Sequence, residues 1–293
     1  MLPGSAYPKM VPMDPLISPA DLADLLRDAT HRPTVLDVRW RMAGPPGRES
    51  YQAGHIPGAV FLDVDTDLAG PPGDGGRHPL PEPARLQERL RAVGVRGDSL
   101  VIAYDDADGS IAARAWWLLR WAGHRRVAVL DGGFAAWQAE GYAVSADQAH
   151  PPRGDIEVAP GSMPVLEADT AAELARDGVL LDARAPQRYT GATEPVDPRA
   201  GHIPAAVNAP FAEHTDERGR WGTPGELAQH FAELGVRADN RVGAYCGSGV
   251  TACSVVLALE VSGRDEPAAL YAGSFSHWCA DPSRPVATGE RCG

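Results

Sequence analysis

The chain repeats itself, and this internal repeat constrains the fold more than any other feature of the sequence. Motifs of the first half return in the same order in the second half. Because each half is long enough for a domain, the repeat indicates a duplicated domain rather than a solenoid of short units. The clearest pairs are Asp-x-Arg at residues 37–39 and 182–184, Gly-His-Ile-Pro at 54–57 and 201–204, Val-x-Ala-Tyr at 101–104 and 242–245, and Gly-x-Phe-x-x-Trp at 132–137 and 273–278.

The 293 residues are therefore expected to form two domains, at residues 10–145 and 163–293. The segment between Ser145 and Met163 is rich in Pro and Gly and is expected to be the linker. In each half, short apolar strands alternate with helices. This order predicts an α/β fold in which each domain is a mostly parallel sheet flanked by helices.

Several helix starts and strands can be placed from local signals. Ser18 before Pro19 predicts a helix N-terminus, and so does the capping box at residues 223–226. A second capping box is expected at residues 170–173, opening a helix at the start of the second domain. The last strand of each half is expected at residues 127–130 and 268–271.

Charge and cysteine content restrict the partners and the compartment. The net charge of −12 argues against binding to nucleic acid or to an anionic membrane, and no apolar run is long enough to span a bilayer. The first eight residues lack the features of a signal peptide. All cysteines lie in the second half without a regular framework, which predicts a reducing, cytoplasmic location; they are Cys246, Cys253, Cys279 and Cys292.

Cys246 occupies the most reactive position in the sequence. It follows an apolar strand at residues 242–245 and precedes a Gly-rich turn and an apolar helix. Ligands of parallel α/β sheets bind at the carboxyl ends of strands, and a turn of glycines can direct N–H groups at one atom. The positive end of the helix would further stabilise a thiolate. A buried structural cysteine is the alternative interpretation, and core packing is the simplest interpretation of Cys253.

The sequence Cys-Gly-Ser-Gly-Val-Thr at residues 246–251 resembles the active-site loop of the rhodanese-type sulfurtransferases, and most closely that of the 3-mercaptopyruvate sulfurtransferase branch. The resemblance extends from about Leu16 to Trp278 and implies two tandem rhodanese-like domains. It also implies that only the second domain is catalytic, because Asp105 stands in the first half where Cys246 stands in the second. Motifs present in both halves, such as Asp-x-Arg and Gly-His-Ile-Pro, are accordingly expected to be structural.

The same resemblance assigns a nucleophile and a proton relay. Cys246 would accept a sulfane sulfur as a persulfide. The hydroxyl of Ser248 would act with His78 and Asp65 as a Ser-His-Asp relay, with Asp63 as the alternative to Asp65.

The resemblance also assigns the groups that bind the substrate. Arg188 and Arg199 would hold a carboxylate, which suits the forked geometry of guanidinium. The remaining loop residues would contact the substrate; they are Gly247, Gly249, Val250 and Thr251.

The resulting hypothesis is transfer of sulfur from 3-mercaptopyruvate to a small thiol, a dithiol protein or cyanide, with no metal or organic cofactor. A thiosulfate sulfurtransferase is the nearest alternative, although members of that branch carry basic residues where Gly247 and Ser248 stand. A Cys-dependent phosphatase would need an arginine where Ala252 stands. A rhodanese module that only binds partners would be expected to lack the nucleophile.

Overall fold

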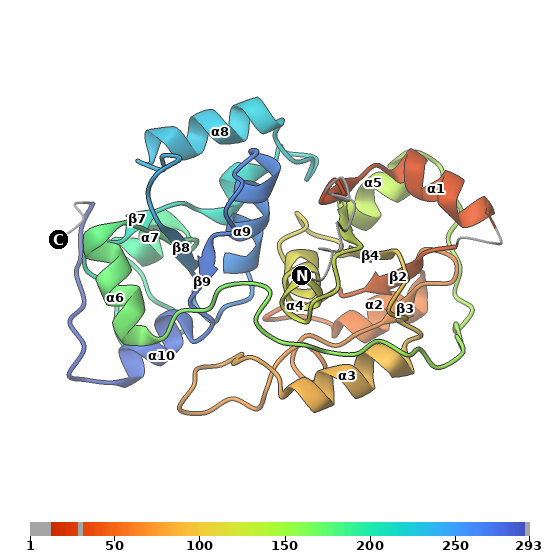
Figure 1. Cartoon of the computed structure of the whole chain (residues 1–293), viewed down its shortest axis with the longest axis horizontal. Helices are drawn as coiled ribbons and strands as arrows, with labels where there is room; N and C mark the ends of the chain where they lie inside the picture. The colour runs from red at the N-terminus through yellow and green to blue at the C-terminus, as the bar shows by residue number, and fades with distance from the viewer. Residues whose placement is uncertain (1–12, 29–31, 291–293) are drawn as a thin grey trace, which may run out of the picture.

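The computed structural model describes residues 13–28 and 32–290, which form two α/β domains lying side by side (Figure 1). Cys292, the first eight residues and the outermost ends of the two expected domains lie outside the described residues. Both domains are built on parallel sheets, as the alternation of strands and helices predicted.

The first sheet has five parallel strands in the order β1-β5-β4-β2-β3. Its strands are β1 (Leu16–Ile17), β2 (Thr34–Asp37), β3 (Val60–Phe61), β4 (Val101–Tyr104) and β5 (Val127–Leu130). Its helices are α1 (Pro19–Arg27), α2 (Gly47–Ala53), α3 (Pro83–Ala92), α4 (Ala112–Trp121) and α5 (Gly133–Ala139). Ser18 caps α1 as expected, since its side chain accepts a hydrogen bond from the Asp21 N–H at 3.1 Å.

The second sheet has four parallel strands in the order β7-β6-β8-β9. Its strands are β6 (Val179–Asp182), β7 (Val207–Asn208), β8 (Val242–Tyr245) and β9 (Ala269–Leu270). Its helices are α6 (Ala168–Asp177), α7 (Pro186–Tyr189), the 3₁₀ turn η1 (Phe211–His214), α8 (Pro224–Glu233), α9 (Ala252–Val261) and α10 (Ser274–Ala280). A single parallel bridge between Val165 and Leu270 stands where the first sheet has β1.

Two expectations about boundaries in the second domain were wrong. Helix α6 begins at Ala168, two residues before the expected N-cap Thr170. Thr170 therefore lies inside the first turn, where its hydroxyl accepts a hydrogen bond from the Glu167 N–H at 2.9 Å. The last strand, β9, is shorter than expected because only Ala269 and Leu270 keep register with β8. The capping box of Thr223 and Glu226 forms as predicted.

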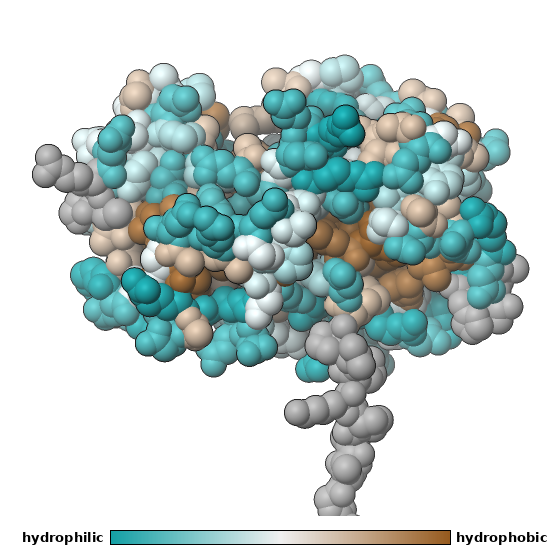
Figure 2. All heavy atoms as spheres, turned by 90° about the horizontal axis from the view of Figure 1, so that it is seen from above, coloured by the Kyte–Doolittle hydropathy of each residue, from teal (hydrophilic) through white to brown (hydrophobic). Residues whose placement is uncertain are grey.

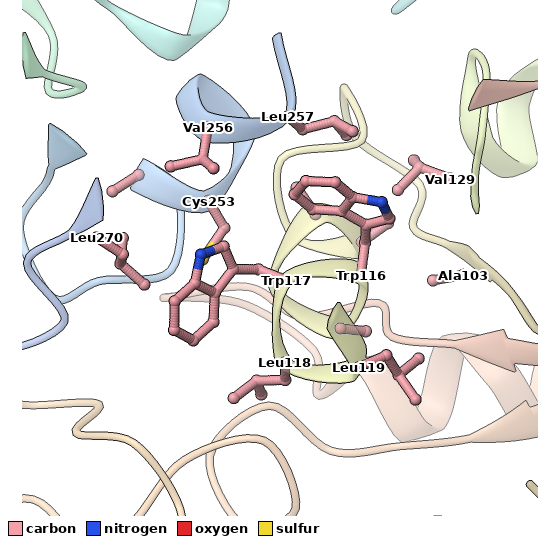
Figure 3. Packing of buried hydrophobic residues seen from close by; sticks show 14 of the residues in the cluster. Ala103, Trp116, Trp117, Leu118, Leu119, Val129, Cys253, Val256, Leu257 and Leu270 are labelled. Carbon is pink, nitrogen blue, oxygen red and sulfur yellow. The ribbon is translucent and has the colours of Figure 1, made fainter. Parts of the chain in front are cut away.

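The main cluster of buried hydrophobic side chains runs through both domains, and each domain has a smaller cluster of its own. Helix α4 of the first domain packs against α9 of the second, and one continuous cluster of buried side chains joins the two sheets across these helices. In Figure 3, Trp116 and Trp117 of α4 lie opposite Cys253, Val256 and Leu257 of α9. The facing helices therefore fix the relative position of the two domains.

The repeated Asp-x-Arg motif makes the same contacts in both halves. Asp37 and Asp182 are buried, and each receives a forked set of hydrogen bonds from the arginine two residues on. Each arginine also donates to a glycine carbonyl, Arg39 to Gly54 and Arg184 to Gly201, both at 2.7 Å. Contacts shared by the two halves fit the structural role that the repeat indicated.

The described surface is largely polar. Figure 2 shows mostly hydrophilic residues on one face, with hydrophobic residues visible in its recesses. Among the described residues, the large hydrophobic side chains that are exposed are Met42, Val144, Val165 and Val196. No helix within residues 13–28 and 32–290 is long and apolar enough to cross a membrane.

Candidate active site

Cys246 lies at the carboxyl end of β8, where the chain leaves the sheet before α9. Strands β6 and β8 are neighbours in the sheet, with β7 on the other side of β6 and β9 on the other side of β8. In sheets of this kind, ligands bind at the carboxyl ends of the two strands where the order reverses, here β6 and β8. The cysteine is only 3 % exposed, and its Sγ accepts a hydrogen bond from the Gly249 N–H at 3.0 Å. The Ser274 hydroxyl lies 4.0 Å from the same sulfur.

Gly249 is required by the shape of this loop. Its φ of +85° is in the left-handed region, and a Cβ at this position would lie 2.2 Å from the Ala272 carbonyl oxygen. Only glycine allows the loop to pass this close to Ala272 while its N–H points at the sulfur of Cys246.

Burial disfavours the thiolate form of the other two described cysteines. Cys253 is fully buried in α9, its Sγ lies 3.4 Å from the Gly249 carbonyl oxygen, and burial raises the pKa of its thiol to about 12. Burial also raises the pKa of Cys279. Because the thiolate is the reactive form of cysteine, both side chains remain protonated at neutral pH. This fits the packing role expected for Cys253.

Ser248, His78 and Asp65 form a continuous chain of hydrogen bonds. His78 Nδ1 lies 2.7 Å from Ser248 Oγ, and His78 Nε2 lies 2.9 Å from Asp65 Oδ1. The chain crosses the domain boundary, since Ser248 belongs to the second domain and the other two residues to the first. The structure thus brings Ser248 next to two residues that lie far earlier in the sequence.

Neighbouring groups orient Asp65 and His78 and shift the pKa of His78. The Trp40 indole N–H donates to Asp65 Oδ2 at 2.9 Å, and its ring meets the His78 ring edge-on at 5.6 Å between centroids. Burial lowers the pKa of His78, while the hydrogen bond that His78 donates to the Asp65 carboxylate raises it. Asp63, the alternative relay residue, instead accepts the N–H groups of Asp65 and Thr66 and so stabilises the turn between them.

The two arginines expected to bind substrate lie in different surroundings. Arg188, on α7, lines the pocket that contains Cys246 and is held by Glu194 and Asp197, each at 2.8 Å from its Nη2. Arg199 is not among the residues that line this pocket. Its Nη1 instead donates to the carbonyl oxygens of Asp281 and Arg284, at 3.3 and 2.9 Å. Of these two arginines, only Arg188 lines the pocket at Cys246.

Three arginines of the first domain reach the site and were not predicted, and one of them, Arg41, lines the pocket and pairs with Asp106. Arg77 lines the pocket and forms an ion pair with Asp197. Arg114 is fully buried on α4 and donates to the carbonyl oxygens of Gly249 in the Cys246 loop and of His78 in the relay, at 3.1 and 3.2 Å. Arg77 directly precedes His78 in the sequence, which was a usable signal. Nothing in the sequence of α4 distinguished Arg114.

The pocket at Cys246 is formed by both domains and has a volume of about 360 Å³. The second domain contributes Cys246, Gly247, Ser248, Val250, Thr251 and Arg188, and the first contributes Trp40, Arg77 and Asp108. Gly249 serves the site through its N–H. Within the described part of the chain, no group of three or more His, Cys, Asp or Glu side chains could hold a metal ion.

In the corresponding loop of the first domain, the N–H groups of the loop surround the carboxylate of Asp105. Asp105 is fully buried, and its carboxylate accepts four backbone N–H groups, those of Ala107, Gly109, Ile111 and Ala112, at 2.8–3.1 Å. A loop of this kind is therefore an anion-binding nest. In the first domain the anion is a carboxylate, and no thiol is present.

Comparison with known proteins identifies the family. The rhodanese-like domain profile matches residues 18–140 and again 167–281. The chain belongs to the rhodanese family and is a sulfurtransferase with two rhodanese-like domains.

Relatives within the family are named for two different sulfur donors. A probable 3-mercaptopyruvate sulfurtransferase of Pseudomonas aeruginosa is 48% identical over 264 residues, which cover 87% of this chain and 92% of that protein. SseB of Mycobacterium tuberculosis, provisionally named a thiosulfate sulfurtransferase, is 42% identical over 278 residues. These residues cover 94% of this chain and 97% of that protein. The crystal structure of Escherichia coli SseA, a 3-mercaptopyruvate sulfurtransferase, has a TM-score of 0.77 at 32% identity and covers 90% of this chain and 100% of that one.

Proposed function

We propose that this protein is a 3-mercaptopyruvate sulfurtransferase that carries sulfane sulfur as a persulfide on Cys246. The observation that carries the proposal is the series of hydrogen bonds from Ser248 through His78 to Asp65. It lies next to Cys246 at the carboxyl end of a strand in a parallel sheet. A proton relay beside a nucleophile suits a donor whose leaving group must be protonated.

The first half-reaction uses the residues around the pocket. The Cys246 thiolate attacks the thiol sulfur of 3-mercaptopyruvate, a sulfur–sulfur bond forms, and the carbon–sulfur bond breaks. The electron pair of the broken bond goes to the departing pyruvate enolate, which takes a proton from the Ser248 hydroxyl. Protonated His78 restores that proton, and Asp65 stabilises the imidazolium. Arg188 holds the substrate carboxylate.

The second half-reaction regenerates the thiolate. The acceptor attacks the outer sulfur of the persulfide, the sulfur–sulfur bond to Cys246 breaks, and Cys246 leaves as a thiolate. A small thiol, a dithiol protein or cyanide can act as the acceptor, because each provides a soft nucleophile. The N–H groups of the Cys246 loop stabilise the persulfide, as the N–H groups of the first-domain loop stabilise the Asp105 carboxylate.

The first domain contributes to the site without a nucleophile of its own. Asp65, Arg77 and His78 all come from it, so it is one wall of the active site. We place the enzyme in the cytoplasm because Cys246, Cys253 and Cys279 are free thiols, as expected in a reducing compartment.

Intact-mass spectrometry after incubation with each donor tests this proposal, followed by steady-state kinetics with 3-mercaptopyruvate and thiosulfate. The wild-type protein should gain one sulfur atom on Cys246 and should show the higher kcat/KM with 3-mercaptopyruvate. Cys246→Ser should gain none and should transfer none, whereas the matched variant Cys253→Ser should still form the persulfide. Sulfur transfer by Cys246→Ser would exclude the proposed mechanism.

A further inference from the structure

Asp105 is a buried charge in the domain that lacks the cysteine. Its side chain is fully buried, and burial raises its pKa to about 6, so the carboxyl group is ionised at neutral pH. Burying a charge costs free energy even when hydrogen bonds surround it. The repeated fold does not require a carboxylate at this point, since Cys246 follows the equivalent strand in the second domain. The carboxylate of Asp105 therefore needs an explanation other than packing.

The two oxygens of this carboxylate hold different parts of the chain. Oδ1 accepts the N–H groups of Ala107 and Gly109 at 3.0 and 3.1 Å, inside the loop that follows β4. Oδ2 accepts those of Ile111 and Ala112 at 2.9 and 2.8 Å, where α4 begins. One side chain thus fixes the shape of the loop relative to the start of the helix.

Both of these parts reach the active site of the other domain. Arg114 lies in the first turn of α4 and donates to the carbonyl oxygens of Gly249 and His78. The loop before α4 forms part of the wall of the pocket at Cys246, through Ala107, Asp108, Ser110 and Ile111. A shift of the Asp105 carboxylate would therefore move the pocket wall and the turn that follows Cys246 together.

The second domain covers this loop. Trp221 lies against Gly109, because a Cβ at Gly109 would be 2.9 Å from Trp221 Nε1. The Trp221 N–H donates to Asp131 Oδ1 at 2.9 Å, and Arg220 forms an ion pair with the same aspartate at 3.2 Å. The loop is thus enclosed between the domains, and the anion that its N–H groups surround is supplied by the chain itself.

We propose that Asp105 is a positioning residue for the active site, and that its negative charge holds the pocket wall and Arg114 in place from the domain without a nucleophile. The inference rests on the Cys246 site proposed above. Asp105 acts through the backbone that it binds and contacts no substrate. A neutral side chain of the same shape cannot replace it, because only a carboxylate accepts all four N–H groups.

Chemical rescue of Asp105→Ala tests this role. The kcat/KM with 3-mercaptopyruvate should fall about tenfold to 10²-fold, the cost of displacing groups around the reacting atoms. Formate should recover part of the loss, because it returns a carboxylate to the four N–H groups. It should also raise the melting temperature of the variant, since it binds the folded state. Formamide has a similar size but no charge and should do neither; the wild-type enzyme in the same solutions is the reference.

Two further variants separate the charge from other effects. Asp106→Ala removes the neighbouring carboxylate, which pairs with Arg41, and its activity should not respond to formate. Asp105→Asn keeps the shape of the side chain but turns an NH₂ group toward two of the N–H groups. Its kcat/KM should also fall, and formate should not recover it, because the amide occupies the site.

Wild-type kcat/KM in Asp105→Asn would overturn the proposal, and this variant decides alone if Asp105→Ala does not fold. Formate that stabilises Asp105→Ala without restoring activity would overturn it too, as would the absence of both formate effects or an equal recovery in Asp106→Ala. Failure of the proposed function would look different. The wild-type protein would then form no persulfide on Cys246, whereas formate would still raise the melting temperature of Asp105→Ala.

Discussion

His78 is a histidine in a loop rich in Gly and Pro, and its contacts make it a candidate for catalysis. It lies between Ser248 and Asp65 at hydrogen-bond distance from both, and it is largely buried beside Trp40. A histidine with one face toward a hydroxyl and the other toward a carboxylate can pass a proton between substrate and solvent. At the scale of single residues, the proposed preference for 3-mercaptopyruvate rests on the hydrogen bonds from Ser248 through His78 to Asp65.

Replacement of Ser248 by alanine should affect the two donors differently. The kcat/KM with 3-mercaptopyruvate should fall about 10²- to 10⁴-fold, the usual contribution of a positioned acid, because the pyruvate enolate loses its proton donor. Thiosulfate turnover should change little, since sulfite leaves without a proton. Ser262→Ala, the same substitution at the far end of α9, is the control and should affect neither donor. Parallel losses with the two donors would remove Ser248 from the proton relay.

The pH dependence with 3-mercaptopyruvate should show an alkaline limb that belongs to His78. A group that supplies a proton must be protonated, so activity should fall as the pH rises through the pKa of His78. Burial lowers this pKa and Asp65 raises it. In Asp65→Asn the pKa should therefore fall further, and the alkaline limb should move to lower pH. Turnover of thiosulfate should lack this limb in both proteins; a limb that stays in place in Asp65→Asn would contradict the assignment.

At the scale of elements, the Cys246 loop is shaped by a helix of the other domain. Arg114 extends from α4 and donates to the carbonyl oxygens of Leu68, His78, Pro79 and Gly249. One buried guanidinium thus connects the turn that follows Cys246 to the loop that carries His78. The distance between Cys246 and His78 is then set by contacts of α4 as well as by their own loops.

Arg114→Met should keep the length of the side chain but leave these buried carbonyl groups without a donor. Unsatisfied buried groups cost about 1–3 kcal/mol each before relaxation, so the free energy of unfolding should fall by roughly 2–4 kcal/mol. Activity with both donors should fall together, because the substitution moves two loops rather than one chemical group. Denaturant unfolding and kinetics with both donors measure these effects. An unchanged stability would show that the carbonyl groups find other partners.

At the scale of the whole molecule, one cluster of buried hydrophobic side chains spans both domains, and each domain also has a smaller cluster of its own. Leu257 of α9 is fully buried, and it faces α4 together with Val256 (Figure 3). The active site lies at the edge of this same interface. A shared core predicts that neither domain unfolds independently of the other.

Leu257→Ala should therefore destabilise both domains. The cavity should lower the free energy of unfolding by about 2–5 kcal/mol. Unfolding followed by tryptophan fluorescence and by circular dichroism should remain one coincident transition. Hydrogen exchange should accelerate in α4 as well as in α9. The matched control is Leu22→Ala on α1, since Leu22 is equally buried but belongs to a cluster within the first domain. It should not accelerate exchange in α9. Two separate transitions would show that the domains fold as independent units.

The sequence by itself determined the duplication, the parallel α/β class and the position of the proposed nucleophile. These depend on local patterns: a strand period, a glycine turn after Cys246, and motifs such as Asp-x-Arg that recur because both domains need the same buried contacts. The family resemblance added Ser248 and Arg188, which line the pocket at Cys246, and His78 and Asp65, which hydrogen bonds connect to Ser248. Their catalytic roles remain predictions.

Tertiary structure alone decided which distant side chains complete the site. Arg199 and Arg77 look equally suitable in the sequence, since each is an arginine in a polar loop. Only packing turns Arg199 toward the carbonyl oxygens of Asp281 and Arg284 and brings Arg77 across the domain boundary to Gly247. Contacts between α4 and α9 fix that boundary, and they depend on shape complementarity over the whole interface. Periodicity and spacing along one chain carry no record of that complementarity.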